Sequence, residues 1–149
     1  MTTTDILDGT VWLSIGTVKQ AVVDCLTNRL AAQVSYGPPG DTVERSTVWV
    51  GNVTGNLHIP LLRASRKPRE ETYALEVVFD AVIPGGEPSD ADLEVLTNLQ
   101  ALDDYLADDP SNPGVLAATL GQFSLIDGLE PQGSWARLTI SIDIMNRLP

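Results

Sequence analysis

Strict alternation of apolar and polar residues marks two stretches of the chain as β-strands. In residues 72–83 the odd-numbered positions, beginning with Tyr73, are apolar, while the even-numbered positions include Glu76 and Asp80. In residues 137–144 every even-numbered position is Leu or Ile. This period of two predicts strands with one buried face each, because successive side chains in a strand point to opposite sides of the sheet. A one-residue shift of the first strand would bury Glu76 and Asp80, so its inward face is well defined.

Two other stretches carry apolar residues at intervals of three and four, the spacing of an amphipathic helix. The first helix is expected from Gly16 to about Ala32. The second is expected to begin at Ser89, whose side chain can cap free backbone N–H groups, and to end near Ala107. The apolar stripe of the first helix comprises Ile15, Val18, Val22, Leu26 and Leu30, and that of the second comprises Leu93, Val95, Leu96, Leu99, Leu102 and Leu106.

Shorter apolar runs between these elements predict the remaining strands. Gln33–Tyr36 and Arg45–Val53 fit two strands. Asn56–Leu62 fits a third, which belongs at a sheet edge or strand end because Pro60 has no N–H to donate. Residues 115–126 are ambiguous, but alternating apolar residues near their end favour a strand that leads through a hairpin into the last one.

This order of elements predicts one α+β domain, with an antiparallel or mixed β-sheet and two helices packed on one face. The domain is expected to span residues 16–149, after an N-terminal arm of residues 1–15 that shows no clear period. The single Cys25 cannot form a disulfide within the chain. No apolar run approaches the ~20 residues that cross a bilayer, and the first residues lack the pattern of a signal peptide. We therefore expect synthesis in a cytosol and no contact with a membrane.

Twenty acidic against nine basic residues give the chain a net charge of −11, but the bases are unevenly placed. So acidic a chain is a poor candidate for sequence-independent DNA binding, which needs a cationic surface. Four of the nine bases nevertheless lie within seven positions just before the long strand. This cationic loop is either a solvated turn, the common role of a charge run, or a contact surface for another chain. Its residues are Arg63, Arg66, Lys67 and Arg69, followed by Glu70.

The second expected helix ends in a cluster of acids, namely Asp103, Asp104, Asp108 and Asp109. Negative charge at a helix C-terminus is unfavourable by ~0.3–1 kcal/mol for each residue. Two interpretations are open: the acids keep the helix end soluble, or they face a central channel or a neighbouring subunit.

The sequence offers no constellation of residues for catalysis. His58 is the single histidine, and no Gly-x-Ser-x-Gly motif provides a nucleophile. Cys25 lies on the apolar side of the first helix, where a buried structural thiol is expected. The paired acids lack the spacing of a calcium loop, and one Cys with one His cannot make a zinc site. We therefore expect a protein that is not an enzyme and that has no catalytic residues, cofactor or metal.

Three segments together resemble the tail terminator (tail completion) proteins of long-tailed phages, most closely those of phages that infect actinobacteria. They are QVSYGPPG at Gln33–Gly40, VWVG at Val48–Gly51, and RKPREE at Arg66–Glu71 before the long strand. The resemblance extends over roughly residues 16–147 and includes the last strand, with WARL starting at Trp135. The N-terminal arm lies outside it.

The resemblance implies a small α+β subunit of the virion tail, made in the host cytoplasm, that assembles with itself into a hexameric ring. Such a ring caps the tube built from tail tube protein, ends its growth, and presents the surface that joins the head through connector or neck proteins. The cationic loop and Glu70 would then contact a neighbouring subunit or the tube. The acids would line a channel that DNA passes without specific binding. A head–tail connector or head-closure protein is one alternative, and a small binding module is another.

Overall fold

The computed structural model describes residues 11–39, 45–58, 69–108, 115, 117–131 and 133–148. Within these ranges the chain forms two helices and five strands, so the expected α+β class is confirmed. In chain order the elements are α2 (Val11–Arg29), β1 (Gln33–Ser35), β2 (Ser46–His58), β3 (Arg69–Ile83), α3 (Pro88–Asp108), β4 (Ala117–Glu130) and β5 (Gly133–Leu148).

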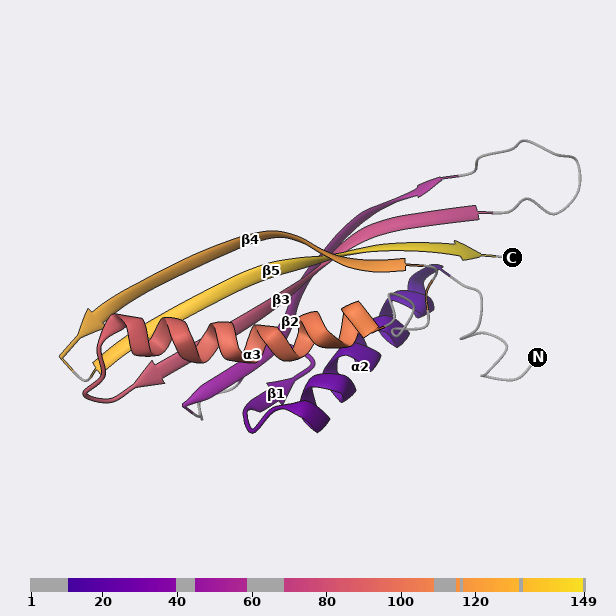
Figure 1. Cartoon of the computed structure of the whole chain (residues 1–149). Coiled ribbons are helices and arrows are strands. Elements are labelled where there is room, and N and C mark those ends of the chain that lie inside the picture. Colours follow the sequence, from indigo (N-terminus) through magenta and orange to yellow (C-terminus); the bar gives the residue numbers. More distant parts are fainter. Residues whose placement is uncertain are drawn as a thin grey trace, which may run out of the picture.

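The five strands form one mixed sheet in the order β1-β2-β3-β5-β4. The short β1 runs parallel to β2, and the other adjacent pairs are antiparallel. β3 and β5 pair along their whole length, from Arg69 opposite Leu148 to Ile83 opposite Ser134. Both helices lie on one side of the sheet, with α3 over β3, β5 and β4 and α2 beside β1 (Figure 1). The predicted arrangement of two helices on one face of a mixed sheet is therefore correct.

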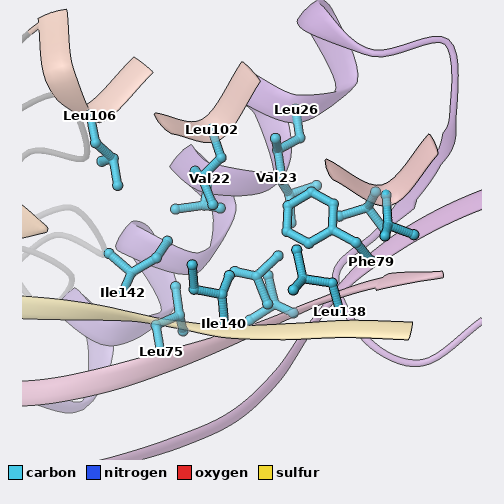
Figure 2. Close-up of a cluster of buried hydrophobic side chains, with 14 of the residues drawn as sticks. Val22, Val23, Leu26, Leu75, Phe79, Leu102, Leu106, Leu138, Ile140 and Ile142 are labelled. Atoms are coloured by element: carbon cyan, nitrogen blue, oxygen red, sulfur yellow. The ribbon is translucent and has the colours of Figure 1, made fainter. Parts of the chain in front are cut away.

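The hydrophobic core lies between the two helices and the face of the sheet that they cover. The alternation predicted for β3 and β5 is confirmed, because all of their expected inward residues are buried. Burying one such large side chain contributes about 1.5–3 kcal/mol. In Figure 2 the sheet supplies Leu75, Phe79, Leu138, Ile140 and Ile142, and the helices supply Val22, Val23, Leu26, Leu102 and Leu106.

The two strands expected at Arg45–Val53 and Asn56–Leu62 are in fact one strand, β2. Its pairing with β3 shifts between Val50 and Val53, where a local irregularity lets the chain continue instead of ending. The glycine in this short segment therefore marks a bulge within a strand and not a break between strands. Pro60, which was expected to mark a sheet edge or strand end, lies outside the described residues.

α2 begins at Val11, five residues before the predicted start at Gly16, and ends at Arg29. Residues 11–15, which were assigned to the N-terminal arm, are therefore helical. No helix in the described ranges combines the length and the apolarity of a membrane span.

α3 begins at Pro88, so the predicted N-cap at Ser89 is wrong. The backbone N–H of Glu87 donates to Asp90 Oδ2 at 2.9 Å, which is the return contact of a capping box. Pro88 then occupies the first helical position, where its missing N–H costs nothing. The sequence contains the residues of this capping box, but serine is found at N-caps more often than glutamate, which favoured Ser89.

The apolar stripe predicted for α3 is wrong at two positions. Leu93 and Leu96 are 65% and 44% exposed, whereas Val95 is fully buried as predicted, together with Ala91, which was not predicted. The buried face continues through Leu102 and Leu106, which were predicted correctly. A single alanine is a weak apolar signal, so the neighbouring leucines dominated the sequence pattern.

β4 and β5 form the predicted hairpin, in which Glu130 at the end of β4 pairs with Gly133 at the start of β5. Gly133 has a φ of 140°, and a Cβ at this position would collide with the carbonyl oxygen of Ile83 and come within 2.7 Å of Pro84 Cα. Glycine is therefore required where β5 starts beside the end of β3.

Candidate assembly surfaces

The predicted cationic loop connects β2 to β3 at one end of the sheet. His58 at the end of β2 pairs with Glu70 near the start of β3, so the two strands meet on either side of the loop. Arg69 is the first residue of β3, and Glu70 is half-buried. The remaining bases of the loop, Arg63, Arg66 and Lys67, lie outside the described residues. Their role as an interface stays a prediction.

The predicted acidic cluster lies at the C-terminal end of α3. Asp103, Asp104 and Asp108 are exposed, and Asp109 lies outside the described residues. Gln100 Nε2 donates to Asp104 Oδ1 at 2.9 Å and to Asp103 Oδ2 at 3.4 Å. The acids therefore point to the surface and are available to a solvent channel or to another chain. Which of these they face stays a prediction.

The face of the sheet opposite the helices is not covered by any described element. At its centre, Arg137 of β5 lies opposite Asp80 of β3 and forms a two-pronged ion pair with it. Arg137 Nε lies 2.8 Å from Asp80 Oδ1, and its second terminal nitrogen lies 2.9 Å from Asp80 Oδ2. The guanidinium carbon also lies 5.3 Å from the centre of the Trp49 ring, within the range of a cation–π contact. The hydrogen bond to Asp80 raises the pKa of Arg137 above its ordinary value.

This ion pair borders a shallow hollow of about 330 Å³ on the uncovered face. Val82 and Ile126, which line it, are 39% and 53% exposed. Tryptophan and arginine next to exposed aliphatic side chains are the composition of interface hot spots. The hollow is lined by Arg45, Asp80, Ala81, Val82, Ile126, Trp135, Ala136 and Arg137.

β4 forms one edge of the sheet and exposes large apolar side chains on both of its faces. Phe123, Ile126 and Leu129 are 71%, 53% and 64% exposed. On the adjacent helix α3, Leu93 is also exposed. Edge strands are commonly protected against pairing by lysine, proline or a very short length. β4 has 14 residues and contains neither lysine, arginine nor proline.

Two carboxyl groups meet where α3 lies against β4. Asp92 of α3 has a raised pKa, first because it is buried from solvent, and then because it shares a hydrogen bond with Asp127 of β4 and feels its charge. Asp127 itself is exposed. This contact makes the seam between α3 and β4 acidic.

The covered face contains a buried glutamate that was not predicted from the sequence. Glu71 is 2% exposed, and Asn146 Nδ2 donates to its Oε1 at 3.0 Å. The neighbouring inward residue, Tyr73, has a strongly raised pKa, mainly because of burial and also because of the charge of Glu71. The alternation of β3 already places residue 71 on the inward face, so the signal was present in the pattern.

The residues considered for chemistry lie apart. Cys25 is buried in α2, and its burial raises the pKa of its thiol. The backbone of His58 ends β2. Among the described residues no three His, Cys, Asp or Glu side chains gather closely enough to hold a metal ion.

Comparison of the sequence with protein-family models and with curated proteins finds no match.

Proposed function

We propose that this chain is a structural subunit of a phage tail, a tail terminator that forms a hexameric ring on the end of the tail tube. The resemblance of residues 16–147 to that family supplies the ring and the tail. The observation that carries the proposal is the division of charge over the surface. α3 contains six acids and β4 contains two, and neither contains a single Lys or Arg.

An acidic surface suits a ring through which DNA must pass. Phosphates are repelled by carboxylates, so an acidic channel lets the genome slide without binding. The exposed Asp103, Asp104 and Asp108 are the residues we assign to the channel or to a neighbouring subunit, together with Asp109. The uncovered sheet face and the exposed edge of β4 offer further surface for protein partners.

The cationic loop is the surface that we assign to the tube or to a neighbouring subunit. Arginine suits such a contact because its planar guanidinium holds a carboxylate through two hydrogen bonds. The triple substitution Arg66→Glu, Lys67→Glu and Arg69→Glu should leave the fold intact and abolish attachment to tail tubes. The matched control, Arg66→Lys, Lys67→Arg and Arg69→Lys, keeps a positive charge at each of the three positions. Attachment that survives the charge reversal would show that the loop is an ordinary solvated turn.

A head-closure or connector protein is the main alternative, and a small binding module is the second. One experiment separates both from a tail terminator. Particles made without this chain are imaged by electron microscopy, with the wild-type chain supplied from a plasmid as the control. A tail terminator gives overlong tubes that are not joined to heads. A head-closure protein gives tails of normal length beside heads that have lost their DNA. Joined particles with normal tails would reject both and favour a small binding module.

A further inference from the structure

The sheet has two incomplete edges, and they lie at opposite ends of the strand order. β4 forms the first edge along its whole length. At the other edge, β1 covers β2 only from Thr47 to Trp49. Beyond Trp49, β2 continues to His58 with no described strand on its outer side. Each chain therefore carries two stretches of backbone that can accept a further strand.

The directions of the strands let these two edges pair without turning either chain over. β2, β3, β5 and β4 alternate in direction, because each adjacent pair is antiparallel. β1 is parallel to β2, so β4 runs opposite to both strands at the other edge. If a second copy is set beside the first in the same orientation, its β1–β2 edge meets β4 as an antiparallel pair.

The two edges differ in charge. On the α3–β4 side, Asp92 lies beside Asp127, and neither α3 nor β4 contains a Lys or Arg, although Glu94 of α3 points away from β4 to Ser46 and Arg45. On the other side, Lys19 of α2 lies over the ring of Tyr36, which directly follows β1, with 4.2 Å between Nζ and the ring centre. Two copies joined β4 to β4 would bring two α3–β4 sides without Lys or Arg together, and the like charge of these sides disfavours such a pair. Contact between unlike edges avoids this repulsion.

The exposed side chains give the contact its apolar part. Phe123 and Leu129 lie on the helix side of β4, because they pair with the inward residues Ile140 and Ser134 of β5. At the other edge Tyr36 is 43% exposed and packs beside Gly16 of α2. An aromatic ring on each side of the contact matches the composition of interface anchors.

We infer that copies of this chain join head to tail through their sheets, with the β4 edge of one copy seated on the Tyr36–Lys19 edge of the next. Contacts between unlike surfaces repeat, and they close into a ring when the rotation between copies permits it. This inference rests on the proposed ring, to which it adds the surfaces that meet.

Cross-linking of two variants that each carry one added cysteine tests the contact. Gln20→Cys places an exposed thiol on α2 beside the Tyr36–Lys19 edge, and Ser124→Cys places one at the centre of β4. Cys25 stays in both, since burial protects it, and the unsubstituted chain measures the background. One variant carries a tag that changes its size, so that mixed and like dimers separate on a gel. A flexible bismaleimide tolerates the unknown register of the two strands.

The expected product is the mixed dimer, in excess over the two like dimers together. A predominance of the Ser124→Cys like dimer would show that β4 pairs with itself and would overturn the inference. Random pairing, in which the mixed dimer forms only as often as the two like dimers together, would overturn the inference as well. So would a yield of mixed dimer no higher than the background. Thr72→Cys, at an exposed position on central β3, replaces Ser124→Cys in the control and should give no excess of mixed dimer.

A charge substitution checks the electrostatic part of the contact. Lys19→Glu should lower the yield of mixed dimer several-fold, while Lys19→Arg should preserve it. Added salt should lower the wild-type yield, because exposed charges are screened over about 10 Å at 0.1 M. If Lys19→Glu leaves the yield of mixed dimer unchanged, Lys19 and its charge take no part in the contact.

The chain with both added cysteines separates this inference from the proposed function. If the edges meet in a six-membered ring, its cross-linked ladder ends at six copies. A ladder that runs on without a stop keeps the edge contact and rejects the ring. Conversely, hexamers on tail tubes that do not cross-link would support the ring and exclude the edge contact.

Discussion

The two faces of the central strands differ sharply, although they belong to the same residues taken alternately. On the covered face Leu75, Phe79 and Ile142 are fully buried. On the uncovered face Val82 and Met145 are 39% and 45% exposed. The covered face holds the helices to the sheet. Among the described residues, no helix or strand packs on the uncovered face, whose side chains contact only one another.

We therefore propose that the fold and the assembly depend on separate residues. Changes to the covered face should alter stability, because they remove buried contacts. Changes to the exposed side chains of the uncovered face and of the edges should alter association and leave the folded chain nearly as stable as before.

The largest effect should come from the covered face. Ile142→Ala should lower the free energy of unfolding by about 2–5 kcal/mol, the usual cost of truncating a buried aliphatic side chain. Met145→Ala, three residues along the same strand at a half-exposed position, should cost less than about 1 kcal/mol. Urea unfolding of both variants measures the difference. Equal losses would mean that the two faces of β5 do not differ in the way described.

A smaller effect, confined to alkaline pH, should come from Tyr73. Its folded-state pKa is raised above the ordinary value of 10.0, so the folded protein binds a proton that the unfolded chain has already lost. Stability is therefore complete below pH 10 and falls as pH rises above it. Tyr73→Phe should reduce this fall, as measured by urea unfolding at a series of pH values.

Tyr36→Phe, at an exposed tyrosine, is the matched control and should leave the alkaline fall unchanged. A Tyr73→Phe profile that overlays the wild-type profile would show that the buried phenol does not contribute to it.

The ion pair on the uncovered face should matter less still. The side chains of Arg137 and Asp80 are 49% and 21% exposed, so solvent screens their attraction. Asp80→Asn should cost no more than about 1 kcal/mol, and the cost should shrink with added salt. Asp143→Asn, at an exposed acid of β5, is the control. A loss of several kcal/mol in thermal unfolding would make the ion pair a part of the fold and contradict its assignment to an association surface.

The smallest effect on stability should come from the acidic cluster. Replacement of Asp103, Asp104, Asp108 and Asp109 by Asn should change the unfolding free energy by less than about 1 kcal/mol, because exposed charges contribute little. The same change should slow DNA delivery by assembled particles. Replacement of the four by Glu keeps the charge and should keep delivery. Normal delivery and normal rings in the Asn variant would favour the view that the acids only solubilise the helix end.

The sequence predicted the covered face well because alternation is a direct record of burial. β3 and β5 repeat it over their central residues without a break, so the inward face of each strand follows from it. It was less informative for α3, where exposed leucines and a buried alanine reversed the usual signal. The pattern therefore fails at Leu93 and Leu96, which lie on the surface of α3.

The association surfaces themselves could not be predicted, for a different reason. Arg137 and Asp80 are 57 residues apart and meet only because β3 and β5 are paired in one register. The sequence does not show that β4 lies at an edge, so Phe123 fits the pattern of an ordinary strand residue. Strand order depends on the whole chain, whereas periodicity reports only on neighbours. The cationic loop and the acids were visible as charge runs, but a charge run does not identify what it faces.

The length of tail tubes grown in the presence of the purified chain tests the central claim most directly. Tube protein is assembled with and without the chain, and the products are imaged by electron microscopy. The account predicts that the chain stops tube growth and that each stopped end carries a ring of six copies of the 16.0 kDa subunit. Tubes of unchanged length, with no ring at either end, would contradict it.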